Sequence, residues 1–416
     1  WHAVAEAAAR LDARGWVRVE ETDAAWTVEP GARAYAIREG GSIVAWRMGR
    51  RAPVESGFRV VGAHTDSPNL RLKSHASAHA EGYALLAVQT YGGVLVHTWF
   101  DRDLGLAGRV TLRVGDGPLR VETRLLRVGR PLCRIPNLAI HLNREVKTSG
   151  FQVNHQSHLP AVWGFHSELG KDPVRAFVAK ELGVAPEQIL GWDLCLYDVQ
   201  PPAVSGLNDD FIHAPRLDNL ACSHAALRAL LDSDGGALPD SSSVVALFDH
   251  EEIGSRTTRG AAGSFTRDVL RRLVGGSEID LGRACARGLM VSADMAHGVH
   301  PNYSEKHEPG HKPMLNGGPV VKMHADWRYA TESESAAVFR GVCQDLGVPT
   351  QEFVTRSDLA CGSTIGPIVA SSLGMRTVDV GSAMWSMHSI REMAGSRDPA
   401  LMAAAMAGVL AWEGAF

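Results

Sequence analysis

Residues 244–255, VVALFDHEEIGS, place four ionisable side chains directly after a strongly apolar run. The run Val244 to Phe248 predicts a buried strand, and Asp249, His250, Glu251 and Glu252 follow it. Charges at the edge of a core are costly unless they are paired, hydrogen-bonded or bound to a metal. Adjacent glutamates can point in different directions, so one could hold a cation while its neighbour handles a proton. A solvated acidic turn is the alternative.

The composition is that of an ordinary globular protein. The chain has 416 residues, which is enough for a large core and for more than one domain. Its formal net charge of -4 gives no sign of nucleic-acid or membrane-surface binding, and no apolar run is long enough to span a bilayer. The six cysteines are scattered, which favours reduced thiols over a disulfide framework. No signal-peptide pattern opens the chain, so we expect a cytoplasmic protein.

A second candidate site follows another predicted strand. Phe58 to Ala63 predicts a buried strand that ends in His64, Thr65 and Asp66. In an H-x-D pattern the histidine can bind a cation, while the carboxylate either ligates it or fixes the tautomer of the imidazole. A strand-end histidine that is simply hydrogen-bonded is the alternative.

The pattern changes between residues 70 and 204. Segments such as Gly108 to Val114 and Leu119 to Val128 alternate apolar and polar residues, as expected of antiparallel strands. We therefore predict a discontinuous first domain, residues 1–69 and 205–416, interrupted by a β-rich domain, residues 70–204. The exposed apolar strands of the inserted domain make it a candidate for subunit contacts.

Three further polar side chains lie near the ends of predicted elements. Asp218 is at the start of a predicted helix, where it is either the N-cap or a ligand. Gly288 to Ala293 predicts a short strand that delivers Asp294, and the strand Thr377 to Val380 is followed by His388.

The carboxyl ends of the strands in an open α/β sheet line one ligand crevice. We therefore expect five side chains to lie together there: His64, Asp218, Glu252, Asp294 and His388. Two histidines and three carboxylates suit a pair of borderline divalent cations such as zinc better than calcium. Two ions about 3.5–4 Å apart must share a ligand, for which we choose Asp218. Glu251 is then surplus to metal binding and is the predicted general base.

Six separated motifs resemble those of the M18 family of aspartyl aminopeptidases, in the same order and over nearly the whole chain. They are GAHTDSPNLRLK, RLDNLA, LFDHEEIGS, SADMAHGVHPNYSEKHE, CGSTIGPI and SMHSIREM. The resemblance implies an α/β catalytic domain with a mixed sheet of the phosphorylase/hydrolase-like type and an inserted dimerisation domain. It also implies a tetrahedral homododecamer and two divalent metal ions per subunit, zinc in the family, with Co²⁺ or Mn²⁺ as alternatives.

The resemblance also implies a role for each candidate residue. The two ligand sets of the family fall here on His64, Asp218 and Asp294 and on Asp218, Glu252 and His388. Asp66 would orient His64, and Glu251 would be the base.

Substrate selection is implied by the resemblance as well. The family's lysine for an acidic N-terminal side chain falls on Lys322, and a histidine lent across the subunit interface falls on His141. A charge-assisted hydrogen bond from Lys322 would discriminate against neutral residues, although an exposed strand lysine is the alternative. Ser363 and Thr364, at an apparent helix start, could also receive an anion or act as N-caps.

We therefore expect a zinc-dependent aminopeptidase that removes N-terminal Asp or Glu from peptides. A related dinuclear aminopeptidase of neutral or broad specificity is the nearest alternative. A metal-binding scaffold without catalysis is disfavoured, because Glu251 is surplus to metal binding. A serine or cysteine hydrolase is not expected, since no G-x-S-x-G motif occurs and the cysteines have no partner signature.

Overall fold

The structure, a computed structural model, describes residues 1–115, 117–168 and 170–416. Within these residues the chain divides into two compact units. The first, named here the sheet unit, comprises residues 3–66, 203–387 and 392–416. The second, the insertion unit, comprises residues 1–2, 67–202 and 388–391. Each unit is described by itself.

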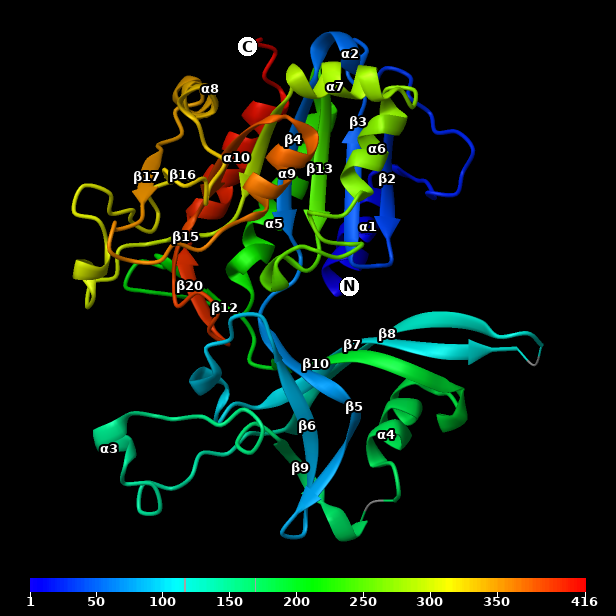
Figure 1. Cartoon of the computed structure of the whole chain (residues 1–416), viewed down its shortest axis with the longest axis vertical. Helices are drawn as coiled ribbons and strands as arrows, with labels where there is room; N and C mark the ends of the chain where they lie inside the picture. The colour runs from blue at the N-terminus through cyan, green and yellow to red at the C-terminus, as the bar shows by residue number, and fades with distance from the viewer. Residues whose placement is uncertain (116, 169) are drawn as a thin grey trace. The chain divides into compact units, whose positions relative to one another are not determined.

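A nine-stranded mixed sheet forms the centre of the sheet unit (Figure 1). Its central strands β13, β4, β14 and β18 run parallel to one another. β4, β13 and β14 are buried along their whole length, as expected of parallel strands that helices cover on both faces. In spatial order the strands are β1 (Val17–Arg18), β2 (Arg33–Arg38), β3 (Ser42–Arg47), β13 (Ser242–Phe248), β4 (Phe58–His64), β14 (Leu289–Ala293), β18 (Arg376–Gly381), β16 (Val320–Met323) and β17 (Gln351–Val354).

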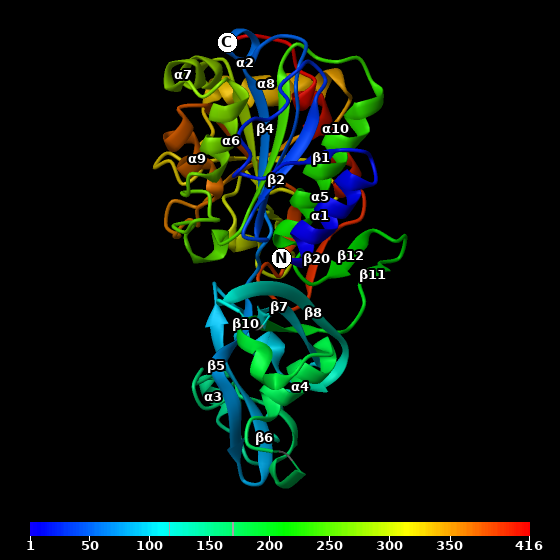
Figure 2. The same cartoon turned by 90° about the vertical axis from the view of Figure 1, so that its right-hand side faces the viewer.

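Helices cover both faces of this sheet, as Figure 2 shows. One layer consists of α1 (His2–Asp12), α5 (Leu217–Asp232), α8 (Ser333–Asp345) and α10 (Asp398–Leu410). The other consists of α6 (Phe265–Leu273), α7 (Glu278–Ala286) and α9 (Ile365–Leu373), with the short α2 (Pro53–Ser56) beside α7. Successive strand residues point to opposite faces, so Val61 of β4 packs in the first core and Val60 in the second. None of the helices in the described residues has the length and apolar character that a membrane span requires.

A second sheet of the same unit has five short strands. They are β11 (Ala203–Ser205), β12 (Phe211–Ala214), β20 (Glu392–Gly395), β19 (Ala383–Trp385) and β15 (Ala296–His297). β19 follows β18 in the chain, so the segment that leaves the large sheet joins the small one before it reaches residue 388.

The insertion unit has a six-stranded antiparallel sheet and a hydrophobic core of its own. Its strands are β8 (Arg120–Cys133), β7 (Leu104–Val114), β10 (Ile189–Asp198), β5 (Asn69–Ala80), β6 (Tyr83–Tyr91) and β9 (Ala161–Phe165). Buried and partly exposed residues alternate along much of β7, and α4 (Pro173–Leu182) adds Val174 and Val178 to the core. The predicted fold class, an α/β domain with a mixed sheet and a β-rich insertion, is confirmed.

Candidate metal centre

The polar side chains of the site lie at or just after the ends of three neighbouring strands, along one edge of the large sheet. β4 ends at His64, β13 ends at Phe248 before the acidic cluster, and β14 ends at Ala293 before Asp294. β4 lies between the other two, and Phe248 is opposite His64 in the register. Because the carboxyl ends of parallel strands meet at the same edge, residues far apart in the sequence become neighbours here.

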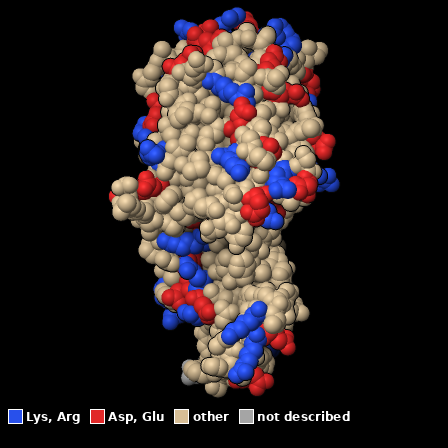
Figure 3. All heavy atoms as spheres, turned by 90° about the vertical axis from the view of Figure 1, so that its left-hand side faces the viewer, with Lys and Arg blue, Asp and Glu red and all other residues tan. Residues whose placement is uncertain are grey.

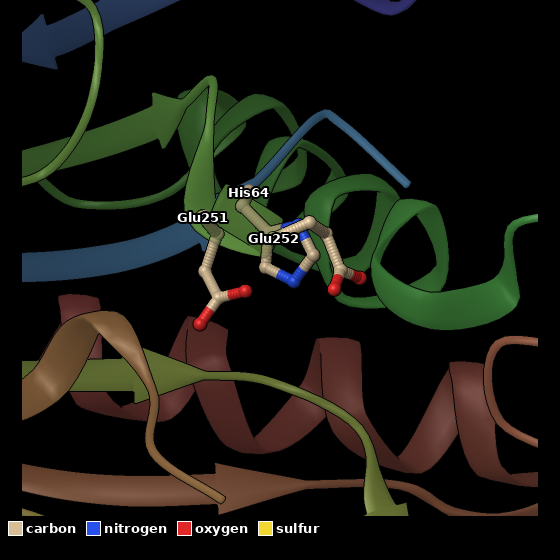
Figure 4. A group of neighbouring side chains, drawn as sticks. All are labelled: His64, Glu251 and Glu252. Atoms are coloured by element: carbon tan, nitrogen blue, oxygen red, sulfur yellow. The ribbon is translucent and has the colours of Figure 1, made fainter. Parts of the chain in front are cut away.

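Figure 4 shows one group of side chains at this edge. Glu251 and Glu252 belong to a 3₁₀ turn, Glu251–Ile253, that follows β13. Their carboxylates lie on either side of the His64 imidazole, and the ligand atoms of the three residues lie within 4.8 Å of one another. His250 begins the turn in the left-handed region, with a φ of 64°. The turn thus separates the two neighbouring carboxylates.

A second group consists of His64, Asp218 and Asp294, which are all buried and whose ligand atoms lie within 4.8 Å of one another. Nε2 of His64 lies 3.4 Å from Oδ1 of Asp218 and 3.6 Å from Oδ1 of Asp294. This nitrogen is buried and makes no hydrogen bond within the described residues. A buried imidazole nitrogen that faces two carboxylates is a donor set that fits a divalent cation.

Asp218 reaches this group from the first turn of α5. Its backbone is not helical, with φ −81° and ψ 107°, and its amide donates a hydrogen bond to Oε2 of Glu392 at 3.0 Å. The side-chain amide of Asn219 donates to the carbonyl oxygen of Ala293 at 2.7 Å. These contacts tie the start of α5 to the end of β14 and hold Asp218 beside His64.

Asp66 connects the imidazole to the acidic turn. Its main-chain oxygen lies 3.0 Å from Nδ1 of His64, closer than its carboxylate at 3.4 Å. The carboxylate accepts hydrogen bonds from the backbone amides of Glu251, at 3.1 Å, and Glu252, at 3.2 Å. A proton on Nδ1 that is donated to the main-chain oxygen leaves Nε2 as the nitrogen that can bind a cation.

Burial and charge shift the pKa values of two groups at the site. Burial, with the nearby carboxylates of Asp294, Glu252 and Asp66, raises the pKa of Glu251 to about 8 although His64 opposes the shift. Burial lowers the pKa of His64, but the carboxylates of Asp218, Asp294 and Asp66 outweigh it and raise this pKa well above its usual value. Excess negative charge of this kind is what a bound cation would neutralise.

The remaining predicted ligand, His388, belongs to the insertion unit. It has a left-handed backbone, with a φ of 68°, and its Nδ1 lies 2.9 Å from the carbonyl oxygen of Gly93. His141 is exposed in the segment between β8 and β9 of the same unit. The roles of both histidines stay predictions.

Lys322 of β16 is buried, so the alternative of an exposed strand lysine is wrong. Its Nζ donates to the carbonyl oxygens of Asp294, at 2.8 Å, and Met295, at 3.3 Å, and lies 5.1 Å from the ring centre of Tyr329. The ammonium group is therefore held against the residue that follows β14.

A cavity of about 320 Å³ lies in the sheet unit, and Tyr329 forms part of its wall. Basic side chains and aromatic rings share its lining, among them His297, His300, Lys306, Phe353 and Arg356. His297 lies in the short strand β15. Burial lowers its pKa, and the charge of Lys322 adds to that shift.

Ser363 and Thr364 precede α9, as the sequence indicated. Thr364 is the N-cap and accepts a hydrogen bond from the amide of Gly366 at 3.3 Å, while its hydroxyl donates to Asp379 at 2.6 Å. The hydroxyl of Ser363 donates to the carbonyl oxygen of Arg328 at 3.2 Å. Thr364 therefore caps α9, which the sequence indicated as the alternative to anion binding.

Two buried charged residues hold segments next to the site, and no sequence motif would reveal them. Asp379 of β18 accepts hydrogen bonds from Ser292 at 2.5 Å and from the amide of Ala330 at 2.6 Å, in addition to that from Thr364. Arg259 contacts the residues just before the acidic turn. Only the tertiary structure brings these side chains to the site.

A mixed sheet whose parallel central strands present imidazole and carboxylate side chains at their carboxyl ends is an architecture of α/β metallohydrolases. A family model described as aminopeptidase I zinc metalloprotease (M18) matches residues 1–408. The chain belongs to this family of zinc aminopeptidases, and the predicted resemblance is confirmed.

Relatives and solved structures agree with this assignment. A probable M18 family aminopeptidase 2 of Pseudomonas aeruginosa is 49% identical over 405 residues, which cover 96% of this chain and 91% of the relative. A chain in the cryo-EM structure of the Ape4 and Nbr1 complex is 37% identical, with a TM-score of 0.94 over 98% of this chain and 82% of that one. A chain of the S. cerevisiae mApe1 dodecamer is 31% identical, with a TM-score of 0.84. The match covers 97% of this chain and 91% of that one.

Proposed function

We propose that this zinc aminopeptidase removes acidic residues, Asp or Glu, from the N-termini of peptides and uses two metal ions per subunit. The observation that carries the catalytic part is the buried Nε2 of His64, which faces the carboxylates of Asp218 and Asp294 beside Glu251. An imidazole nitrogen buried in this way fits a metal ligand better than a structural histidine, because a structural one would have a hydrogen-bond partner.

The proposed ligands fall into two sets that share one carboxylate. They are His64, Asp218 and Asp294 for one ion and Asp218, Glu252 and His388 for the other. When bound, the ions would polarise the scissile carbonyl group and make a water molecule more acidic. Zinc is favoured because imidazole and carboxylate together suit a borderline cation, and Co²⁺ or Mn²⁺ could replace it.

Glu251 is the proposed general base. Its carboxylate would take a proton from the attacking water and deliver it to the amine that leaves. A base with a pKa near the working pH transfers protons in both directions. Burial raises the pKa of Glu251 in the metal-free site, and bound cations would lower it again. Asp66 would hold the amide of Glu251 in place and fix the tautomer of His64.

Lys322 supports the acidic specificity. An ammonium group has three donors, and two of them are directed to the carbonyl oxygens of Asp294 and Met295. The third could donate to the side-chain carboxylate of the substrate, and a buried lysine left without an anion would disfavour neutral residues. The lining of the neighbouring cavity contains Lys306 and Arg356, which agree with an acidic substrate, together with the acidic Glu308, and Arg356 is ion-paired with Asp358. His141 of another subunit and Ser363 are further proposed substrate contacts.

A second candidate is an aminopeptidase of neutral or broad specificity. The aromatic part of the cavity lining, Tyr329, Phe353 and Trp385, favours it, because these rings could pack against an apolar side chain. The carbonyl oxygens around Lys322 would then serve only to hold this lysine in the fold.

The proposal extends to assembly and surroundings. A tetrahedral homododecamer is supported by the dodecamer of the S. cerevisiae neighbour, with the insertion unit as the proposed dimerisation domain. On the face seen in Figure 3, basic and acidic side chains are interspersed, which agrees with peptides rather than nucleic acid as partners. A cytoplasmic location is part of the same proposal.

A panel of Asp, Glu, Leu and Lys aminoacyl substrates tests the function. The proposal predicts hydrolysis of the Asp and Glu substrates, loss of activity after chelation, and recovery when zinc, cobalt or manganese is added. Preference for Leu or Lys would favour the second candidate. Absence of chelator-sensitive hydrolysis would favour a scaffold without catalysis.

A further inference from the structure

We propose that Arg259 is a positioning residue for the turn that carries Glu251 and Glu252, a role that rests on the proposed function of these glutamates. Arg259 is 7% exposed, and its guanidinium contacts three side chains. Nε donates to Oδ2 of Asp249 at 3.0 Å, and Nη1 donates to Oε2 of Glu39 at 3.1 Å. The remaining nitrogen, Nη2, lies 3.0 Å from Nε2 of His250.

These contacts fix the tautomer of His250. A guanidinium group donates hydrogen bonds and cannot accept them, so Nε2 of His250 must be the acceptor and Nδ1 must bear the proton. Nδ1 lies 2.8 Å from Oγ1 of Thr257, which also accepts a hydrogen bond from the amide of Gly260 at 2.9 Å. The imidazole of His250 is therefore held at both nitrogens by the loop that contains Arg259.

The network is tightly enclosed. The hydroxyl of Ser42 donates to the carbonyl oxygen of Arg259 at 2.7 Å and accepts a hydrogen bond from the amide of Asp249 at 2.9 Å. A Cβ atom at Gly41 would lie 2.4 Å from Oδ2 of Asp249 and 2.8 Å from Cδ of Arg259. Only a residue without a side chain fits at position 41 while these contacts persist.

The location of the network gives it a role in catalysis. Arg259 holds Asp249 and His250, the two residues that directly precede Glu251. Asp66 holds the amides of Glu251 and Glu252 themselves. The guanidinium of Arg259 and the carboxylate of Asp66 together determine where Glu251 and Glu252 lie. A displacement of a catalytic group by about 1 Å can reduce the rate about 10²-fold.

The test compares Arg259→Lys with Arg38→Lys. Arg38 is the control, because its side chain is mostly buried and its ion-pair partners, Glu21 and Asp268, do not belong to the acidic turn. Zinc affinity of the metal-free proteins is measured by competition with a chromophoric chelator, and Tm, kcat and KM are measured at saturating zinc. For Arg259→Lys we expect zinc affinity and kcat each to fall about 10- to 100-fold, with little change in KM. Arg38→Lys should lower Tm alone.

Wild-type zinc affinity and kcat in Arg259→Lys, or equal losses in Arg38→Lys, would overturn the proposal. If Arg259→Lys does not fold, Thr257→Val takes its place, because Oγ1 of Thr257 holds the other nitrogen of the imidazole that Arg259 contacts. A folded Thr257→Val protein with wild-type zinc affinity and kcat would contradict the proposal, and a loss in both would support it. If the wild-type protein hydrolyses no aminoacyl substrate, the proposed function fails, while the zinc affinities still test the role of Arg259.

Discussion

The carboxylate of Asp66 accepts a hydrogen bond from the backbone amide of Glu251 at 3.1 Å. One carboxylate at the end of β4 therefore fixes the turn at the end of β13, while the main-chain oxygen of the same residue fixes His64. A single residue thus sets the relative positions of the proposed base and a proposed ligand.

Asp66→Asn should weaken the site through this contact. An asparagine has only one side-chain acceptor, so one of the amides of Glu251 and Glu252 would face an NH₂ group. We expect zinc affinity and kcat to fall about 10- to 100-fold. Chelator competition and steady-state kinetics measure the two effects. Asp193→Asn, which removes an ion pair with Arg109 in the insertion unit, should leave both unchanged, and equal effects of the two variants would argue against the role of Asp66.

Lys322→Met tests the origin of the specificity. Loss of a charge-assisted hydrogen bond of about 1.5–3 kcal/mol should lower kcat/KM for Asp and Glu substrates about 10- to 100-fold. Leu substrates provide the internal control and should change little. A parallel loss on acidic and neutral substrates would show that Lys322 supports the fold rather than the choice of substrate.

The metal-free protein should become less stable as the pH rises. The folded-state pKa of Glu251 is raised by burial to about 8, above the ordinary value of 4.5 for an unfolded glutamate. Between these values the folded state retains a proton that the unfolded state has released, so the free energy of unfolding decreases by at most about 1.4 kcal/mol per pH unit. Melting of chelated wild-type and Glu251→Gln proteins at pH 6 and pH 8 measures this effect. The wild-type Tm should fall more, and identical shifts would contradict the assignment.

Gly41→Ala should disturb the network around Arg259. The added methyl group would overlap Oδ2 of Asp249, and overpacking of this kind costs about 1–3 kcal/mol. We expect a lower Tm together with lower kcat at saturating zinc. Gly282→Ala in α7 is the matched control, since its methyl group would meet no atom within 4 Å, and it should be neutral or slightly stabilising. Unchanged kcat in a destabilised Gly41→Ala protein would separate the network from catalysis.

The sequence reveals those site residues that lie at or directly after the end of an apolar strand. β4, β13 and β14 consist mostly of apolar residues, so their ends, with His64, the acidic turn and Asp294, could be located by pattern alone. Helix α4 also has local signals in the sequence, because Asp172 and Pro173 lie at its start and Gly183 at its end.

The supporting contacts could not be predicted in this way. Arg259 and Asp379 are single charged residues in ordinary surroundings, and their burial depends on partners more than 200 and about 90 residues away, such as Glu39 and Ser292. Lys322 was expected either to be exposed or to bind a substrate, and only the packing of β16 shows that it is buried. His388 was expected just after a strand of the large sheet, whereas β19 of the small sheet intervenes and the residue belongs to the insertion unit.

The most direct test of the central claim is the metal content and the turnover of Glu251→Ala, measured on the same sample. If Glu251 carries the proton and the other carboxylates and histidines hold the metal, the variant should keep wild-type zinc stoichiometry and affinity close to wild type. Its kcat on an Asp substrate should fall about 10²- to 10⁴-fold, the usual contribution of a general base. Wild-type turnover, or loss of the metal together with the activity, would contradict the division of roles between Glu251 and Glu252.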